Sequence, residues 1–237
     1  GFKLCVGRPE EFASLVAAMI KTNIAPDFVT VDGTEGGTGA APPEFSNSVG
    51  MPLIEGLTFV NDILTGAGIR DQVKIITAGK VISGFSVVRN LALGADICNS
   101  ARAMMFALGC IQALKCDSNK CPSGVATQNP ALMAGLDPND KSVRVFNYQK
   151  NTVDAALHII GAAGYDSPAG VSRDHVMVRT DGVYCASYAE LYPAVKPGSL
   201  LDGTAERQNL QQIWDAGLLL VNREHEAIEH EDHYLPN

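Results

Sequence analysis

Hydrophobic residues along this chain gather first into four short runs, at residues 2–6, 28–31, 73–77 and 96–98. Each run is almost continuously apolar and rich in β-branched side chains. Alternation of apolar and polar positions is typical of a strand with one wet face, whereas a continuous run is typical of a parallel strand covered on both faces. We therefore expect four buried parallel strands.

Amphipathic helical patterns fill the gaps between these runs. The first begins at Pro9 and places apolar residues on one face as far as Ile20. A second follows Pro52 and is expected to end by Gly66, and a third follows Ser83. This alternation of strands and helices predicts an α/β fold built of βαβ units. Four such units make half of a (β/α)8 TIM barrel, although an open doubly wound sheet gives the same pattern.

The rest of the chain has a different character. A longer helix carrying Met104, Met105 and Leu108 is expected after the fourth strand, and another between residues 142 and 161. Frequent Gly and Pro from Thr180 onward predict a C-terminal extension that is irregular. We divide the chain into a half-barrel, a cysteine loop with a helical extension, and a C-terminal tail, at residues 1–109, 110–180 and 181–237.

Composition and charge exclude several classes of function. The formal net charge is -8 and the sequence pI is about 5.1, which argues against binding to nucleic acid or anionic membranes. No apolar run reaches the roughly 18 to 20 residues of a membrane span, and no signal peptide is visible. We expect a cytoplasmic protein. Because residues 2–6 already read as a strand, we also expect the chain to begin part-way through a larger one.

Three of the six cysteines, Cys110, Cys116 and Cys121, lie within twelve residues of one another, and Pro122 follows the last. Thiolates are soft metal ligands, and a proline directly after a cysteine recurs at iron–sulfur sites. Zinc or a four-iron cluster requires a fourth ligand, which this loop lacks. The pattern therefore favours a [3Fe–4S] cluster, with three unligated thiols as the alternative.

Other candidate chemistry follows the expected strands. The loop at residues 32–42 has four glycines in seven residues, which permit close approach of the backbone to a ligand, although a merely flexible loop has the same composition. The turns after the third and fourth strands lead into helices, whose N-terminal N–H groups bind phosphate. The residues of these turns that we expect to contribute are Gly79, Lys80, Ser100, Ala101 and Arg102.

Two segments together resemble the FMN-binding synthase domain of the glutamate synthase family. They are VDGTEGGTGAAP at residues 31–42 and GCIQALKCDSNKCPSGV at residues 109–125. The resemblance implies a (β/α)8 barrel of which this chain supplies the fifth to eighth strands and the iron–sulfur loop. Many members of the family have Asp-Gly-Gly where this chain has Ala78-Gly79-Lys80, so a lysine contact to the phosphate is an expected departure.

The resemblance also implies roles for individual residues. Lys3 corresponds to a catalytic lysine near flavin N1 and the substrate, and Gly79, Ser100 and Ala101 correspond to the phosphate turns. Cys110, Cys116 and Cys121 correspond to the [3Fe–4S] ligands. The loop that lines the flavin and 2-oxoglutarate corresponds to Glu35, Gly36, Gly37, Thr38 and Gly39. Of these, Glu35 is also expected to have a catalytic role.

The implied activity is an oxidoreductase in which reduced FMN transfers hydride to 2-iminoglutarate and gives L-glutamate. The implied partners are 2-oxoglutarate, ammonia or glutamine-derived ammonia, and an electron donor such as ferredoxin or an NAD(P)H-dependent subunit. One alternative is synthesis or oxidation of N-substituted glutamates with the same cofactors. Another is a catalytically incomplete half-barrel that self-associates to cover its strand edges, as a homo-oligomer.

Overall fold

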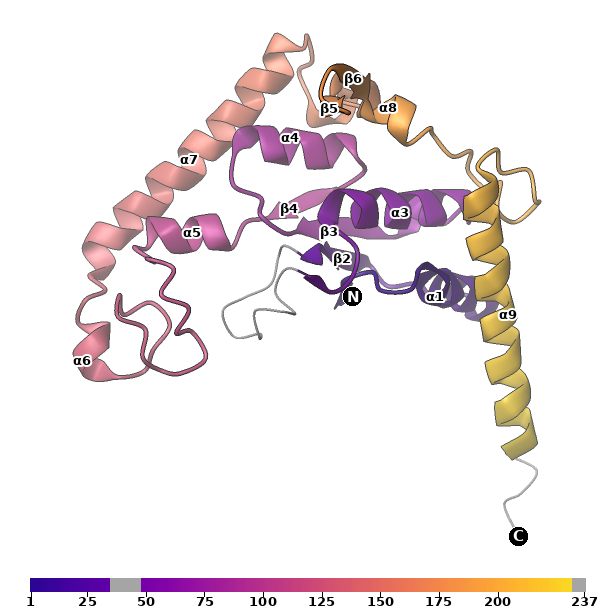
Figure 1. The fold of residues 1–237 in the computed structure, drawn as a ribbon, viewed down its shortest axis with the longest axis horizontal. Helices are drawn as coiled ribbons and strands as arrows, with labels where there is room; N and C mark the ends of the chain where they lie inside the picture. Colours follow the sequence, from indigo (N-terminus) through magenta and orange to yellow (C-terminus); the bar gives the residue numbers. More distant parts are fainter. Residues whose placement is uncertain (35–47, 232–237) are drawn as a thin grey trace.

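The central element is a sheet of four parallel strands in consecutive order (Figure 1). The computed structural model describes residues 1–34 and 48–231, with side chains of that range as far as residue 222. The strands are β1 (Phe2–Leu4), β2 (Phe28–Asp32), β3 (Lys74–Ala78) and β4 (Ile97–Asn99). A doubly wound sheet reverses its strand order part-way, whereas a barrel adds each strand beside the last. The order β1-β2-β3-β4 therefore confirms the expected fold class, four βα units of the TIM-barrel type.

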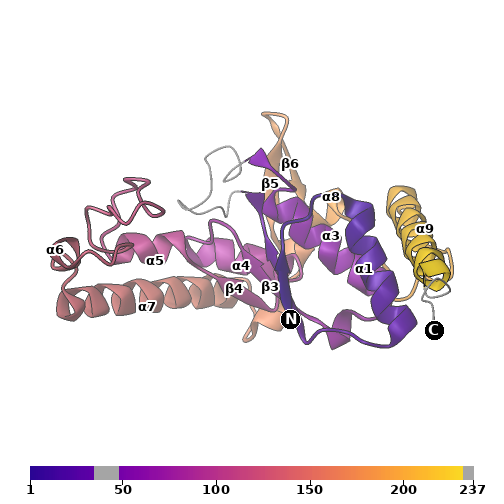
Figure 2. The same cartoon turned by 90° about the horizontal axis from the view of Figure 1, so that it is seen from below.

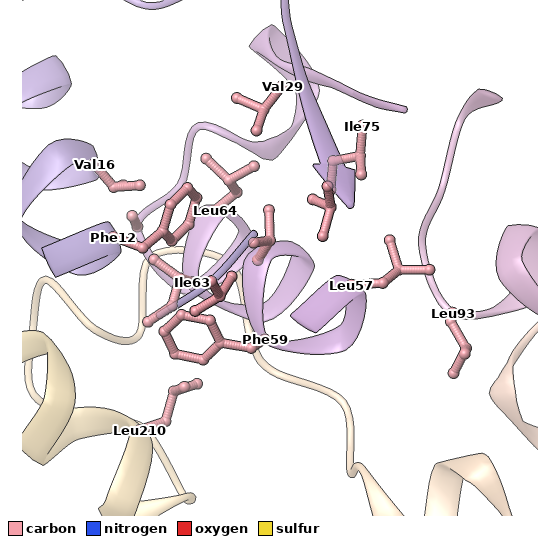
Figure 3. Packing of buried hydrophobic residues seen from close by; sticks show 14 of the residues in the cluster. Phe12, Val16, Val29, Leu57, Phe59, Ile63, Leu64, Ile75, Leu93 and Leu210 are labelled. Atoms are coloured by element: carbon pink, nitrogen blue, oxygen red, sulfur yellow. The ribbon is translucent and has the colours of Figure 1, made fainter. Parts of the chain in front are cut away.

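One face of the sheet packs against three helices, α1 (Pro9–Thr22), α3 (Leu53–Gly66) and α4 (Gly84–Ala92) (Figures 1 and 2). Val29, Val31 and Ile75 point into this layer and are fully buried. Figure 3 shows the core that they share with the helices, where the rings of Phe12 and Phe59 meet edge to face with centroids 6.0 Å apart. The apolar runs thus fold as strands because this face removes them from water.

The opposite face of the sheet is open within the described part of the chain. Lys3, Thr30, Ile76 and Ile97 occupy one row across the four strands, because the register pairs each with the next. Ile97 is 51% exposed, and Phe28, two residues before Thr30 and on the same face, is 38% exposed. In a closed barrel this face is the interior, so the exposed apolar side chains fit half of a barrel.

The middle segment contains three helices, which are α5 (Arg102–Ala107), α6 (Pro130–Met133) and α7 (Pro138–Ala162). Of these, α7 packs against α4 and α5. The helix expected to include Leu108 ends one residue earlier, and Gly109 then takes φ +101°. The helix expected from residue 142 begins at Pro138, because the Asp137 carboxylate accepts a hydrogen bond from the Asn139 N–H and caps it.

The C-terminal segment is more regular than expected. It contains a hairpin, β5 (Met177–Thr180) and β6 (Tyr184–Ser187), whose turn holds Asp181 and Gly182. Asp-Gly between apolar runs is a known hairpin signal, and this hairpin is a regular part of an extension expected to be helical and irregular. The remaining elements are η2 (Arg70–Gln72), η3 (Pro168–Gly170), η4 (Arg173–His175), α8 (Tyr188–Leu191) and α9 (Gln208–Glu231).

Helix α9 runs along α1 and brings the C-terminal segment into the core (Figures 1 and 2). Trp214 is 1% exposed, and Leu200 and Leu210 join the same buried cluster as the sheet. The carboxylate of Asp62 on α3, itself buried, accepts hydrogen bonds from Arg173 and Arg207. The division into three segments stays a prediction, while the core draws on both the first and the last of them.

Candidate functional site

The described strands all end at one edge of the sheet, as the carboxyl ends of parallel strands do. Asp32, Ala78 and Asn99 lie side by side in the last row of register. The residues that follow them open the loops in which sequence analysis placed the flavin contacts. Active sites of barrel enzymes lie at this end of the strands. The structure therefore brings the starting points of the three predicted loops to one place.

Lys3 reaches this edge from β1, where its ammonium lies 2.5 Å from the Asp32 carboxylate on β2. The Lys3 side chain is 61% exposed, whereas that of Asp32 is 16% exposed. The second carboxylate oxygen of Asp32 is buried and has no hydrogen-bond partner among the described residues. A buried acceptor without a donor is uncommon in folded proteins, so this oxygen has capacity for a donor from outside the described residues.

Asp32 is a residue to which sequence reasoning gave no role. The signal was available, because an acidic side chain at the carboxyl end of a buried strand costs free energy unless it is paired. The pairing with Lys3 was not available, because it depends on which strands are neighbours. Here β1 and β2 are adjacent, so the two side chains meet across the strand pair.

The glycine loop leaves and rejoins the fold at the same edge. The N–H of Gly33 donates to the Ala78 carbonyl at 3.0 Å, and that of Thr34 donates to the Met51 carbonyl at 3.3 Å. The N–H of Met51 in turn donates to the carbonyl of Val6, beyond β1. The predicted loop residues Glu35, Gly36, Gly37, Thr38 and Gly39 lie outside the described residues.

The turn between β3 and α4 requires a glycine at its first position. Gly79 has φ +133°, and a Cβ there would lie 3.3 Å from the backbone nitrogen of Gly33. Lys80 follows with φ 45° and an exposed side chain, which leaves its ammonium accessible near the edge. Ser83 caps α4 by accepting from the Ser86 N–H, in a reciprocal capping box. The helix N-terminus is thus fixed beside the turn.

The turn between β4 and α5 is fastened to the turn before α4. The Ser100 hydroxyl donates to the Val81 carbonyl at 2.8 Å, so its proton is used within the protein. Ala101 is exposed, and Arg102 begins α5. The structure therefore brings together Gly79, Lys80, Ser100, Ala101 and Arg102 at two neighbouring turns, as sequence analysis predicted for a phosphate site.

The three cysteines of the predicted cluster have different surroundings. Cys121 is buried, Cys110 is half-buried and Cys116 is exposed. The Ser123 hydroxyl, 3.4 Å from the Cys121 sulfur, and the backbone N–H of Ala126 lower the pKa of that thiol to about 7. Within the described residues, no three Cys, His, Asp or Glu side chains converge as metal ligands. The conformation seen here therefore does not fit a three-cysteine cluster.

An apolar groove lies between α5 and α7, beside the cysteine loop. Its volume is about 590 Å³, and its lining includes Leu108, Leu136 and Phe146, with Lys141 at its edge. A small dicarboxylate is poorly matched to such a lining, because its charges would lose water without finding enough donors. The groove is therefore not the candidate substrate site.

Among the described helices, none combines the length and apolar character that crossing a membrane requires.

Comparison with known proteins agrees with this geometry. A family model described as the conserved region in glutamate synthase matches residues 2–166. The chain is 43% identical over 181 residues to a glutamate synthase large subunit-like protein of Bacillus subtilis, covering 76% of this chain and 34% of that protein. It is 38% identical over 155 residues to an archaeal glutamate synthase [NADPH] of Methanocaldococcus jannaschii, covering 65% and 30%.

Solved structures offer a fainter likeness. A mutant flavocytochrome b2 with benzoylformate aligns with a TM-score of 0.39 and 18% identity, over 71% of this chain and 41% of that one.

The chain spans about a third of the length of the curated relatives that it matches, 34% of the Bacillus subtilis protein and 30% of the Methanocaldococcus jannaschii protein. From the match over residues 2–166, which is more than half of the chain, we conclude that it belongs to the glutamate synthase family.

Proposed function

We propose that this chain supplies half of the flavin site of a glutamate synthase-like oxidoreductase. The observation that carries the proposal is the pair of Lys3 and Asp32 at the carboxyl edge of the sheet, 2.5 Å apart, with one buried carboxylate oxygen that no described residue donates to. Bound FMN, once reduced, supplies the hydride that, with a proton, converts 2-iminoglutarate into L-glutamate. The protein binds and orients the reacting groups.

Lys3 and Asp32 form a donor and acceptor set that suits a flavin ring. The pyrimidine edge of the ring presents carbonyl acceptors on either side of an N–H donor. An ammonium donates to a carbonyl or to negative charge near N1, and the free oxygen of Asp32 accepts from an N–H. The exposed ammonium also attracts a substrate carboxylate, because both 2-oxoglutarate and 2-iminoglutarate are anions at neutral pH.

The two neighbouring turns would hold the phosphate of the flavin. The first N–H groups of a helix lack intrahelical acceptors, and α4 begins directly after the Gly79 turn. Lys80 adds a cation that is exposed at the same turn, and Arg102 is a second cationic side chain at the start of α5. Gly79 fits this role because it lets the turn pass within van der Waals distance of Gly33.

Cys110, Cys116 and Cys121 remain our proposed ligands of a [3Fe–4S] cluster, on the strength of their number and spacing. Since they do not converge in the described conformation, we assign no electron-transfer step to them. The test is iron content after anaerobic reconstitution with iron and sulfide. We expect Cys116→Ser to lose iron and Cys185→Ser, also an exposed free cysteine, to keep it. Equal iron in both variants would remove the assignment.

The wider reaction needs partners that this chain would meet as part of a longer protein or an assembly. Ammonia, free or released from glutamine, would form the imine with 2-oxoglutarate. An electron donor, ferredoxin or an NAD(P)H-dependent subunit, would reduce the flavin. Relatives named glutamate synthase [NADPH] support the second kind of donor.

The exposed sheet face supports a second candidate, a half-barrel that self-associates. Phe28 and Ile97 leave apolar surface open, and β1 and β4 are the edges of the sheet in the described part of the chain. Sedimentation without flavin tests this second candidate: a dimer is expected and a monomer would remove it, whereas FMN binding tests the first candidate whatever the oligomeric state.

Activity provides the test of the proposed function. The purified chain is mixed anaerobically with FMN reduced by dithionite, 2-oxoglutarate and ammonium, and glutamate is measured by mass spectrometry. We expect the chain to bind FMN, and any glutamate that forms to match the reduced flavin consumed in a 1:1 ratio, since one hydride reduces one imine. Failure of the chain to bind FMN would overturn the proposal.

A further inference from the structure

Helix α7 packs against the two helices, α4 and α5, that follow the proposed phosphate turns. The cysteine loop lies in the connection that joins α5 to α7 (Figure 1). Nothing in the sequence pattern places α7 near the flavin turns, since residue 148 is 66 positions from residue 82. The packing therefore places α7 beside the turn before α4, although the two are distant in the sequence.

The contact between α4 and α7 is close at the start of α4. A Cβ on Gly84, the first residue of α4, would lie 2.6 Å from the backbone nitrogen of Ala156 and 2.8 Å from the Ala155 Cβ. Val88, Ala156 and Ile160 form a small buried cluster of their own beside this point. The N-terminus of α4 therefore rests directly on the backbone of α7.

Tyr148 on α7 adds a directional bond at the turn itself. Its hydroxyl donates to the Ile82 carbonyl at 2.7 Å. The preceding carbonyl, of Val81, accepts from Ser100 at 2.8 Å. Two consecutive carbonyls of one turn are thus bound by hydroxyl groups from two other parts of the chain.

Both packing and hydrogen bonds restrain this turn. Val81 is buried at 3% exposure, but the side chains of Ile82 and Phe85 are 56% and 50% exposed, so after Val81 the restraint comes from hydrogen bonds. The N–H groups of Ile82 and Ser83 both donate to the Ser86 hydroxyl. If the peptide after Ile82 rotates, its N–H leaves the Ser86 hydroxyl and its carbonyl oxygen turns toward the site, where an oxygen repels an anion.

From these contacts we infer that Tyr148 is a positioning residue for the phosphate of the flavin. It binds the Ile82 carbonyl, as Ser100 binds the carbonyl of Val81, and so keeps that oxygen from turning toward the anion. The inference rests on the proposed FMN site. Beyond that site, the inference assigns to α7, the helix that follows the cysteine loop, the role of fixing the phosphate turn.

The test compares FMN with riboflavin, which has the same ring and no phosphate. Tyr148→Phe removes only the hydroxyl, and Tyr184→Phe is the control, because Tyr184 is 71% exposed on the hairpin. Dissociation constants come from quenching of flavin fluorescence. We expect Tyr148→Phe to weaken FMN binding about three- to tenfold, the effect of one hydrogen bond, and to leave riboflavin binding unchanged. The control should leave both unchanged.

Hydrogen exchange gives an independent readout without any flavin. We expect the amides of residues 79–85 to exchange several-fold faster in Tyr148→Phe than in the unaltered chain. Equal FMN affinity in the unaltered chain and Tyr148→Phe, or an equal loss for FMN and riboflavin, would overturn the positioning role. Absence of FMN binding by the unaltered chain would instead overturn the proposed site, and the positioning role would fall with it.

Discussion

The guanidinium of Arg173 donates to the carboxylate of Asp62 at 2.6 Å, and these residues lie 111 positions apart. Arg207 donates to the other oxygen of the same carboxylate. The Asp62 side chain is 2% exposed, while those of Arg173 and Arg207 are 11% and 22% exposed. One buried anion on α3 therefore binds two cations that lie beyond residue 166, where the stretch matched by the family model ends.

Replacing Asp62 by Asn should destabilise the fold strongly. The change removes the anion and leaves two partly buried guanidinium groups without a counter-charge, which costs on the order of 3 kcal/mol. The free energy of unfolding is measured in urea. The control is Glu206→Gln, which breaks the exposed pair with Lys196 and should have no measurable effect. Equal stability of Asp62→Asn and the unaltered chain would contradict this account of the C-terminal segment.

Two glycines in helices should respond in opposite directions to alanine. A Cβ on Gly217 of α9 would lie 2.8 Å from the Ala13 Cβ and 2.8 Å from the Ser14 nitrogen, so Gly217→Ala should separate α9 from α1 at a cost of about 1–3 kcal/mol. A Cβ on Gly161 of α7 would have no neighbouring atom within 4 Å, and Gly161→Ala should stabilise the fold by about 0.5 kcal/mol. Thermal unfolding checks both signs. Equal changes in the two melting temperatures would contradict the close contact.

Thiol labelling tests the burial of Cys98. Burial raises the pKa of this thiol to about 11, with Arg89 opposing the shift, so the reactive thiolate is scarce at pH 8. We expect iodoacetamide to modify exposed Cys185 much faster than Cys98 in the folded chain. Since a raised pKa means that the thiolate appears only at higher pH, labelling of Cys98 should accelerate as the pH approaches 11. Peptide mass spectrometry gives both rates, and equal rates at pH 8 would contradict the burial.

Much of the half-barrel was predictable because its signals are local. The strands appear in the sequence as apolar runs because they lie in the core. The helices begin at Pro9, after Pro52 and after Ser83, and in each case a proline or a capping serine marks the start. The choice between a barrel and a doubly wound sheet was not local. It depends on the pairing of β3 with both β2 and β4, which no single segment encodes.

The candidate site divides in the same way. Gly79 and Ser100 were identified from their turns, and the structure places those turns together. The partners Asp32 and Tyr148 were missed, because each acts on a residue of another element. The cysteines are the reverse case, since their spacing predicts a cluster that the described conformation does not assemble.

A matched pair of lysines tests whether FMN binds at the carboxyl ends of the strands through Lys3. Lys3 and Lys74 both lie in strands and pair with an aspartate, and their side chains are 61% and 60% exposed. Lys74, however, is the first residue of β3 and so lies at the amino ends of the strands, opposite the candidate site. The measurement is FMN titration of Lys3→Gln and Lys74→Gln by flavin fluorescence. The account predicts binding at least about tenfold weaker in Lys3→Gln, the loss of one charge-assisted hydrogen bond, and unchanged binding in Lys74→Gln. Equal FMN affinity in the two variants would contradict it.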